Sequence, residues 1–427
     1  MARNKKQKKK QVATPKQLTR ESAGPTAIRS LWGSGTVASR LTPAKLAGIM
    51  QASAEGDNDA QLTLAEEMEE RDLIYSSVLR TRKLAVAGVD VTVAASDSED
   101  ENAKALAEQV TKLTKQPEFG QLIIDSLDAL GKGYSVHEIL WDKGETRWTP
   151  RYKHRDPRFF MPHPKRPDEL RIIDESDMQN GVEMPQFKFI VHTPNLKTGL
   201  MHRGGLARLA AFSYVCKMYG IKDWLGFLEI YGIPLRIGKY DNNAKPDEVE
   251  ILKTAVMNLG SDAAAVMPES MQIEFQQIAQ TAGASDVFAR LAEFVDKQVS
   301  IAVLGQSATT EGTPGRLGND DAQSEVRQDI VDYDSLQLAN TLNRDLVKPF
   351  IDLNFGVQDE YPAIVISVPE KEDLNLMAGI LEKLVPLGLP VEAKDVLRKL
   401  GLPEPKAGAS LLGVAAPVVS EDTASNS

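Results

Sequence analysis

A proline-free stretch, Leu206–Tyr231, constrains this chain of 427 residues more than any other segment. Its apolar residues are Leu206, Leu209, Phe212, Val215, Met218, Ile221, Trp224, Leu225 and Leu228. The spacing predicts a long helix, and its many steps of three make the apolar positions drift around the helix. Such a helix needs cover on several sides. In a single compact domain it would be a core helix, whereas in a ring it would pack against neighbouring subunits.

A second long helix is predicted over 283–304, with Ser285 at its N-cap and Gly305 just after its last turn. Its apolar stripe consists of Phe288, Leu291, Val295 and Val299. The stretch 305–318 that follows has small and polar residues and almost nothing to bury. We therefore expect a mobile loop there.

A third helix is predicted over 319–347, with Asn319 as its N-cap, and its expected core face is Val326, Ile330, Tyr333 and Leu336. The opposite face carries four acids at i, i+4, i+8 and i+11 spacing, namely Asp321, Glu325, Asp329 and Asp332. Like charges at this spacing repel, and only the first lies where the helix dipole compensates. An ordinary solvated face explains the pattern. A wall that repels a polyanion explains it too, because repetition around a pore would strengthen the field.

The remaining parts predict an α+β fold. Short strands and helices alternate over 71–195, and the turn at 142–145 indicates a hairpin. Between the first two long helices, 233–282 predicts a small unit of one strand, one helix and two strands, with Pro246 opening the helix. Two short helices are expected within 371–405. Residues 1–60 show faint periodicity and 406–427 lack aromatic residues, so we expect both to be flexible.

Charge is distributed unevenly along the chain. The first 20 residues hold eight basic residues and no acid, which leaves 42 basic against 60 acidic residues, near −18, for the rest. A short basic arm on an acidic body is not typical of a sequence-specific DNA-binding protein, which would carry a basic face on its folded part. The arm is either a contact for nucleic acid or an acidic partner, or a solvated tail.

No catalytic, cofactor-binding or metal-binding pattern is present in the sequence. It lacks a phosphate-binding loop and a His-Glu-x-x-His motif, and its five histidines are not spaced as metal ligands. Cys216 is the single cysteine and lies among apolar residues, so we expect a buried core residue. No apolar run is long enough for a membrane span and the basic N-terminus lacks the apolar stretch of a secretory signal, so we expect the cytoplasm as the place of synthesis.

Four short segments give the chain a family resemblance. They are RDLIYSSV at 71–78, GYSVHEILW at 133–141, GFLEIYGIP at 226–234 and VLGQS at 303–307. In this order, and with this succession of lobe, helix, insertion, helix, loop and acidic helix, the chain resembles the Mu-like bacteriophage portal family. The implied parts are a wing at 61–200, a first stem helix at 203–232, a clip at 233–282, a second stem helix at 283–304, a tunnel loop at 305–318, a tunnel helix with its return to the wing at 319–370 and a small crown at 371–405.

The resemblance implies a ring of subunits, usually twelve, at one vertex of the virion capsid, assembled in the bacterial host cytoplasm. Double-stranded DNA would pass through it, and the terminase large subunit, tail connector proteins and capsid or scaffold proteins would bind it, with no cofactor. The candidate residues are Asp321, Glu325, Asp329 and Asp332 for the channel lining, Thr309, Thr310, Glu311 and Arg316 for the tunnel loop, and Lys239, Tyr240 and Lys245 for the clip.

Two alternatives remain from the sequence. One is another head–tail connector or minor capsid protein, which would share the ring but not the terminase partner. The other is a cytoplasmic Mg²⁺-dependent enzyme acting on nucleic acid, in which scattered carboxylates converge in a cleft.

Overall fold

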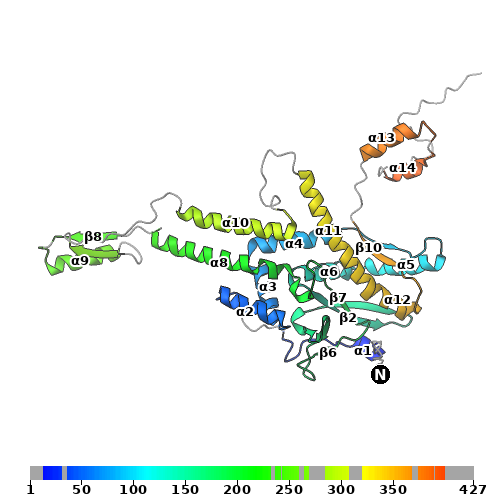
Figure 1. Ribbon diagram of the computed structural model, residues 1–427, viewed down its shortest axis with the longest axis horizontal. Helices are drawn as coiled ribbons and strands as arrows, with labels where there is room; N and C mark the ends of the chain where they lie inside the picture. Colours follow the sequence, from blue (N-terminus) through cyan, green and yellow to red (C-terminus); the bar gives the residue numbers. More distant parts are fainter. Residues whose placement is uncertain are drawn as a thin grey trace, which may run out of the picture. The chain divides into compact units, whose positions relative to one another are not determined.

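The computed structural model describes residues 13–30, 36–231, 236–241, 243–258, 264–268, 284–306, 320–367, 374–388 and 390–399. Contacts divide the chain into two units, Met1–Val368 and Pro369–Ser427. The helices and strands of both are drawn in Figure 1. The first unit holds the α+β lobe and the long helices, in agreement with the predicted fold class.

Four helices open the first unit: α1 (Pro15–Thr19), α2 (Pro43–Ala54), α3 (Asp59–Arg71) and α4 (Leu73–Ala87). Thr42 caps α2, where Pro43 takes the first helical position. Asp72 ends α3 and caps α4, because its side chain accepts hydrogen bonds from the N–H groups of Ile74 and Tyr75. Asp72 alone therefore separates the two helices, as the C-cap of α3 and the N-cap of α4.

The prediction of a flexible arm over residues 1–60 is wrong for 13–30 and 36–60, and residues 1–12 lie outside the described part. Leu18 of α1 is buried, and its carbonyl oxygen accepts a 2.9 Å hydrogen bond from Lys188 Nζ. The fully buried Glu138 accepts hydrogen bonds from the backbone N–H groups of Ser22 and Ala23. A buried carboxylate that needs these donors holds the segment against the lobe.

The lobe is built on a three-stranded antiparallel sheet in the order β3-β2-β7. Its strands are β2 (Ser135–Lys143), β3 (Trp148–Arg155) and β7 (Phe189–His192). The central strand β2 is buried over most of its length, and Trp141 is fully buried. Three helices lie between β1 (Val91–Ala94) and β2, namely α5 (Glu101–Thr114), α6 (Pro117–Ser126) and α7 (Ala129–Lys132). Helix α6 packs on β2 and β3, which places the core between helices and sheet.

Two small antiparallel sheets complete the lobe. One has the order β4-β5-β6, with strands β4 (Phe160–His163), β5 (Arg166–Ile172) and β6 (Val182–Glu183). The other pairs β1 (Val91–Ala94) with β10 (Ala363–Ile366). A strand near the end of the first unit therefore lies beside the strand that follows α4. The short 3-10 turns η1 (Pro157–Phe159) and η2 (Met201–Arg203) link these parts.

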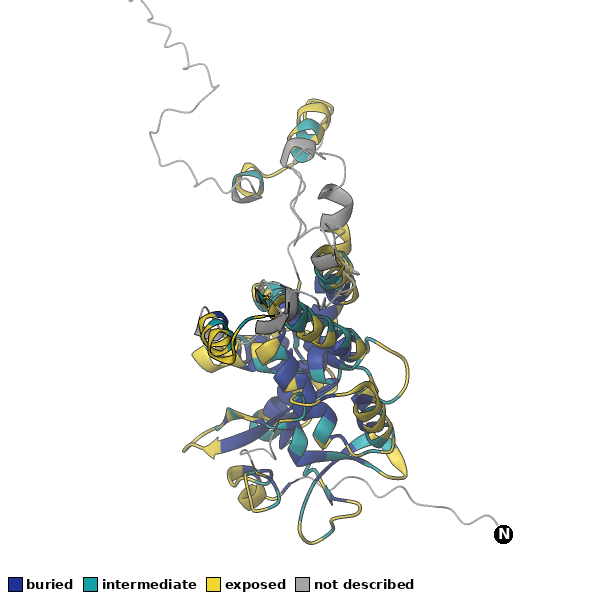
Figure 2. Ribbon diagram, turned by 90° about the vertical axis from the view of Figure 1, so that its left-hand side faces the viewer, coloured by how far each residue is buried: buried dark blue, intermediate teal, exposed yellow. Residues whose placement is uncertain are grey.

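The predicted long helices are present. They are α8 (Leu206–Tyr231), α10 (Ala284–Leu304) and α11 (Asp320–Leu342), and α11 continues through a π-helical turn, η3 (Asn343–Val347), into α12 (Lys348–Phe355). Helix α10 begins at Ala284, so Ser285 lies in its first turn and not at the N-cap. Helices α8 and α10 pack on each other, and α10 also packs on α4. Figure 2 shows buried residues (dark blue) gathered at the centre of the first unit and exposed residues (yellow) around them.

Between α8 and α10 the described residues form β8 (Arg236–Tyr240), α9 (Pro246–Asn258) and β9 (Ala264–Pro268). The two strands pair in parallel, and α9 packs on both. The additional strand predicted near 272–276 lies outside the described residues. In the second unit, the described residues form α13 (Leu374–Leu384) and α14 (Ala393–Lys399), as the sequence predicted.

Candidate functional site

The predicted acidic face of α11 is present and exposed. Glu325, Asp329 and Asp332 are all exposed, and Gln328 Nε2 donates a 2.8 Å hydrogen bond to Asp332 Oδ1. The side chain of Asp321 lies outside the described residues. Three carboxylates on one side of a helix form a negative strip that water solvates in the single subunit.

The predicted core face of α11 is wrong. Val326, Tyr333 and Leu336 are 41%, 48% and 55% exposed. The residues buried instead are Val331, Asp334, Ser335, Leu338, Ala339, Thr341 and Leu342. Three of these seven residues, Asp334, Ser335 and Thr341, are polar, which interrupts the apolar pattern of this face. The exposed face with Val326 and Tyr333 remains available for contact with another molecule.

A buried ion pair explains how Asp334 can face the core. Arg82 of α4 donates two hydrogen bonds to Asp334, from Nε at 2.7 Å and from Nη2 at 3.0 Å. Arg82 Nη1 also donates to the backbone oxygen of Val303, in the last turn of α10, at 2.8 Å. Both side chains are almost fully buried. One guanidinium thus joins the last turn of α10 to the second half of α11, the two helices that flank the predicted tunnel loop.

The loop itself falls largely outside the described residues, including Thr309, Thr310, Glu311 and Arg316. Its first residue is described. Gly305 has a φ of +72° and its N–H donates to the oxygen of Ile301, which ends α10 as predicted. A Cβ on Gly305 would lie 2.9 Å from Val326 Cγ1. The chain therefore leaves α10 in close contact with α11.

The candidate clip residues lie at one end of β8 and at the start of α9. Lys239 and Lys245 are exposed and Tyr240 is half-buried. In the register with β9, Lys239 pairs with Met267 and Tyr240 with Pro268. Two exposed cations beside a tyrosine suit a protein surface that binds an acidic partner.

Helices α8 and α10 carry large apolar side chains that the rest of the subunit leaves exposed. On α8 these are Leu209, Phe212, Met218, Tyr219, Leu225 and Leu228, and on α10 they are Val287, Leu291, Phe294 and Ile301. Phe212 and Phe294 are 64% and 61% exposed. An apolar surface of this kind on a folded subunit marks a protein contact.

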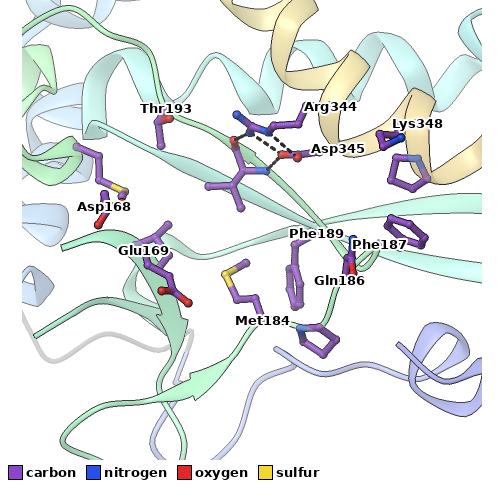
Figure 3. A pocket seen from close by; sticks show the side chains of 15 residues that line it. Asp168, Glu169, Met184, Gln186, Phe187, Phe189, Thr193, Arg344, Asp345 and Lys348 are labelled. Atoms are coloured by element: carbon purple, nitrogen blue, oxygen red, sulfur yellow. Dashed lines mark hydrogen bonds and ion pairs between the residues drawn. The ribbon is translucent and has the colours of Figure 1, made fainter. Parts of the chain in front are cut away.

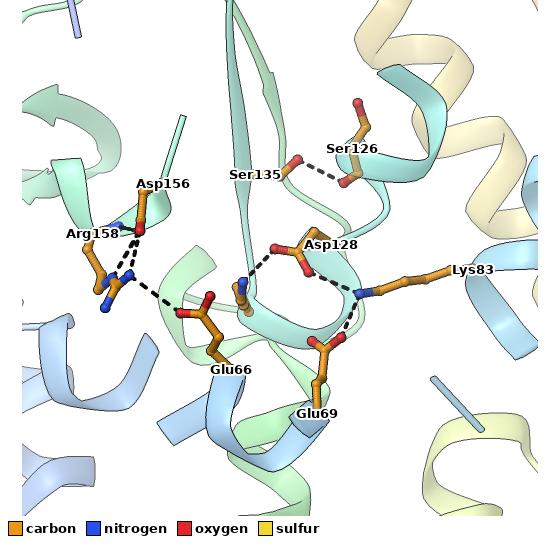
Figure 4. Close-up of polar contacts among 9 residues, drawn as sticks. Glu66, Glu69, Lys83, Ser126, Asp128, Ser135, Asp156 and Arg158 are labelled. Carbon is orange, nitrogen blue, oxygen red and sulfur yellow. Dashed lines mark hydrogen bonds and ion pairs between the residues drawn. The ribbon is translucent and has the colours of Figure 1, made fainter. Parts of the chain in front are cut away.

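Carboxylates that approach one another in the lobe are paired with cations. Lys83 Nζ lies 3.0 Å from both Glu69 and Asp128, and Lys132 lies 2.9 Å from Asp128 (Figure 4). Burial alone would raise the pKa of Asp128, but Lys132 and Lys83 outweigh it and lower the pKa to about 2. Arg158 pairs in the same way with Asp156 and Glu66. These contacts stabilise the fold and leave little negative charge for a Mg²⁺ ion.

A cavity of about 610 Å³ lies beside the edge strand β7 (Figure 3). Phe187, Phe189 and Met184 give it an apolar wall. Five charged residues line it, and two of them bond to the backbone of Val191: the N–H of Val191 donates to Asp345 Oδ2 at 3.0 Å, and Arg344 Nη2 donates to the oxygen of Val191 at 2.9 Å. These side chains cap the outer edge of the sheet, which is a structural role.

Within the described part of the chain, no group of three or more His, Cys, Asp or Glu residues is placed to hold a metal ion. Cys216, expected in the core, is only partly buried on α8. Among the described helices, none combines the length and the apolar character that a membrane span requires.

Comparison with known proteins identifies the family. The model for the portal protein of Mu bacteriophage matches residues 62–402, which is most of the chain. The chain belongs to the Mu-type portal protein family. It is 36% identical over 377 residues to the Mu-like prophage FluMu protein gp29 of Haemophilus influenzae, with 86% of this chain and 71% of that protein covered. It is 34% identical over 376 residues to the portal protein of Escherichia phage Mu, with 86% and 72% covered.

Solved structures share the portal fold. A chain in the neck of a native gene transfer agent particle, computed with C12 symmetry, has a TM-score of 0.51 and 14% identity, and the match covers 84% of this portal protein and 99% of that chain. A chain in the virion of the same kind of particle gives a TM-score of 0.51 at 13% identity with equal coverage. At such identities the likeness concerns the fold alone.

Sequence reasoning missed the polar contacts that position this portal protein's α11. Arg82 and Asp334 are 252 residues apart, and nothing local marks either as a partner of the other. Asn343, Arg344 and Asp345 of the π-helical turn were also missed, although they bond to strands β10 and β7. Three consecutive polar residues inside a helical pattern were the only available signal.

Proposed function

We propose that this portal protein is one of twelve subunits of a ring at a capsid vertex, and that double-stranded DNA passes through the ring. The observation that carries the proposal is the construction of α11. Its exposed side holds Glu325, Asp329 and Asp332, while its buried side is anchored by Arg82. Family membership and the likeness to a chain from a C12 neck support the ring.

The acidic face of α11 would line the channel. A carboxylate strip repels the phosphates of DNA, and repetition in every subunit turns a weak local field into a continuous negative wall. DNA would then slide without binding to the wall, which a positive lining would not allow. The tunnel loop with Thr309, Thr310, Glu311 and Arg316 would set the bore between adjacent α11 helices.

Partners would bind elsewhere on the subunit. Lys239, Tyr240 and Lys245 of the clip would contact the terminase large subunit during packaging and a tail connector protein afterwards. The wing would face capsid or scaffold proteins, and the ring would assemble in the bacterial host cytoplasm before it becomes part of the virion. The chain would perform no catalysis of its own, since the motor supplies the chemical energy.

The first test is the size and shape of the purified protein. Mass photometry should give a particle near twelve times the chain mass of 46.8 kDa, and negative-stain microscopy should show a central hole. A particle without a hole at every salt and protein concentration, together with metal-dependent cleavage of DNA, would favour an enzyme and overturn the proposal.

The second test concerns the channel. Reversing three charges with E325K, D329K and D332K should leave ring formation intact and sharply reduce the DNA packaged per particle, because phosphates would bind the wall. The matched control reverses three exposed acids of the lobe, Glu99, Glu108 and Glu145. Equal packaging by both triple variants would exclude α11 as the channel lining.

The third test separates a portal from another connector. K239E together with K245E should abolish binding of the terminase large subunit in a pull-down, while ring size stays unchanged. A wild-type ring that binds tail proteins but never terminase would favour the connector reading.

A further inference from the structure

We propose that α8 carries two apolar faces that close the ring, with the first face of each subunit packing against the second face of the next. The inference rests on the ring of the proposed function. It assigns the surfaces that build this ring and the pair of charges that aligns them.

The first face runs along one side of α8 and continues onto α10. It consists of Leu209, Phe212, Cys216, Tyr219 and Asp223 of α8 with Val287, Leu291, Phe294 and Ile301 of α10. The spacing is that of a seven-residue repeat on both helices. The two parts adjoin, because a Cβ on Gly220 would lie 3.0 Å from Leu291 Cδ2. Nothing in the described part of the subunit covers Phe212 or Phe294.

The second face lies on another side of α8. It consists of Met218, Lys222, Leu225 and Glu229, of which Met218 and Leu225 are 45% and 58% exposed. At about 100° per residue, the centres of the two faces are roughly 130° apart around the helix. The second face is also distinct from the side that packs on α10 through Lys217 and Phe227, which adjoins the first face. One helix thus presents two separate apolar surfaces to its surroundings.

Two different surfaces are what a closed ring requires. A dimer with twofold symmetry buries the same patch on both subunits, whereas a ring buries one patch of each subunit against a different patch of the next. A single apolar face would suit a dimer, a membrane surface or a peptide. Two separate faces, roughly 130° apart on one helix, favour a further copy of this chain on each of the two sides.

Charge complementarity sets the register between copies. Rotation about the ring axis does not change height, so residues close in number on the two faces come to lie opposite each other. Tyr219 of one copy then meets Met218 of the next, and Asp223 of one copy meets Lys222 of the next. Both charged residues are exposed, and neither forms an ion pair within the described residues of the subunit. Adjacent residues cannot pair on their own helix because they point to different sides.

A charge-swap experiment tests the register. K222D and D223K should each lower the fraction of protein in rings by about tenfold at a fixed low micromolar concentration, because every interface then faces like charges. The double variant K222D/D223K restores opposite charges across each interface and should recover rings. The matched control is K112E, an exposed charge change in the lobe outside both faces, which should leave the rings unchanged.

Cys216 provides a readout that needs no substitution. As the single cysteine in the first face, it should react with a maleimide in dissociated subunits and be protected at least about tenfold in rings, since burial at an interface excludes the reagent. F212D should abolish rings while the circular dichroism spectrum and melting temperature of the subunit persist, because the side chain is already exposed.

The outcomes separate this inference from the proposed function. If wild-type protein forms rings but Cys216 reacts as fast in rings as in subunits, or K222D/D223K fails to recover rings lost by the single variants, the faces are assigned wrongly and the ring itself stands. If F212D leaves rings intact, the first face is likewise excluded. If wild-type protein forms no ring with any partner present, the proposed function fails and this inference fails with it.

Discussion

The α+β lobe and the long helices use their side chains in opposite ways. In the lobe, even charged residues are buried and matched, as with Glu138, which is fully buried between Arg155 and Lys188. On α8 and α10, large apolar residues such as Phe212 and Phe294 stay exposed. The lobe contains what it needs to be stable alone. The long helices expose apolar side chains that only contact with another molecule can cover.

This difference separates substitutions that damage folding from substitutions that damage assembly. A buried residue of the lobe should change the free energy of unfolding of the isolated subunit. An exposed residue of α8 or α10 should change only the association of subunits. The two classes meet at α11, which is anchored by a buried ion pair on one side and exposes carboxylates on another.

The largest effect on stability is expected at that anchor. D334A leaves Arg82 buried without its partner, which should cost about 3–5 kcal/mol in the free energy of unfolding. Urea unfolding followed by tryptophan fluorescence measures it. Replacing both partners, R82M with D334L, should recover much of the loss because no charge is then left buried. A loss below about 1 kcal/mol for D334A would mean that the pair does not hold α11.

A matched pair of phenylalanines tests the comparison directly. F119A removes a side chain that is 2% exposed in the lobe and should cost about 3–5 kcal/mol. F294A removes one that is 61% exposed on α10 and should cost less than about 1 kcal/mol in the isolated subunit. Thermal melting of dilute protein distinguishes them. Equal shifts would show that α10 has an internal core after all.

Acid should weaken the junction between the lobe and α11. Burial, with Arg344 and His137 adding to it, lowers the pKa of His192 to about 3, and His192 Nδ1 lies 3.0 Å from Thr341 Oγ1. The unfolded chain takes up a proton near pH 6.5, whereas the folded chain does so only near pH 3. Stability should therefore fall by up to about 1.4 kcal/mol per pH unit as the pH drops from 6.5.

The measurement is urea unfolding between pH 6.5 and pH 4.5, a range above the titration of most carboxylates. H192Q should flatten the dependence, because glutamine keeps a polar group near Thr341 but takes up no proton. The same slope in wild-type protein and H192Q would assign the acid sensitivity to another group. His202 is the next candidate, since burial with Arg208 and Arg203 lowers its pKa to about 4.

The smallest effect is expected on the acidic face. E325Q, D329N and D332N together should change the stability of the isolated subunit by no more than about 0.5 kcal/mol, since exposed like charges on a helix repel only weakly. Differential scanning calorimetry at low and at high salt checks this. A large stabilisation that disappears in salt would mean that the repulsion is strong even in the single subunit.

Periodicity predicted the elements whose apolar residues are local signals. The helices α8 and α10 and the end of α10 at Gly305 follow from the spacing of apolar residues and one glycine. The hairpin of β2 and β3 was also predicted, since the turn at 142–145 marks it. The exposed acidic residues of α11 were correctly placed on one side, because helical spacing alone decides that.

Tertiary contacts decided what the sequence could not predict. The buried side of α11 contains Asp334, which an apolar pattern assigns to solvent, and its burial is made favourable by Arg82 from a distant helix. The short helix α1 has a single buried residue, Leu18, too little for a periodic signal. The channel, clip and loop assignments came from the family resemblance and remain predictions.

The π-helical turn has a consequence for how the protein is made. Asp345 and Arg344 cover the outer edge of β7 at Val191, and Asn343 bonds to both backbone groups of Ile364 beside β10. Asp345 follows Val191 by 154 residues, which a ribosome adds in roughly 8–30 s. During that interval the backbone N–H and C=O groups of Val191 in β7 have no partner from the turn, while α8 and α10 are synthesised. Slow synthesis would therefore favour capture of this edge by chaperones or by neighbouring nascent chains, and faithful production of the subunit depends on the turn arriving in time.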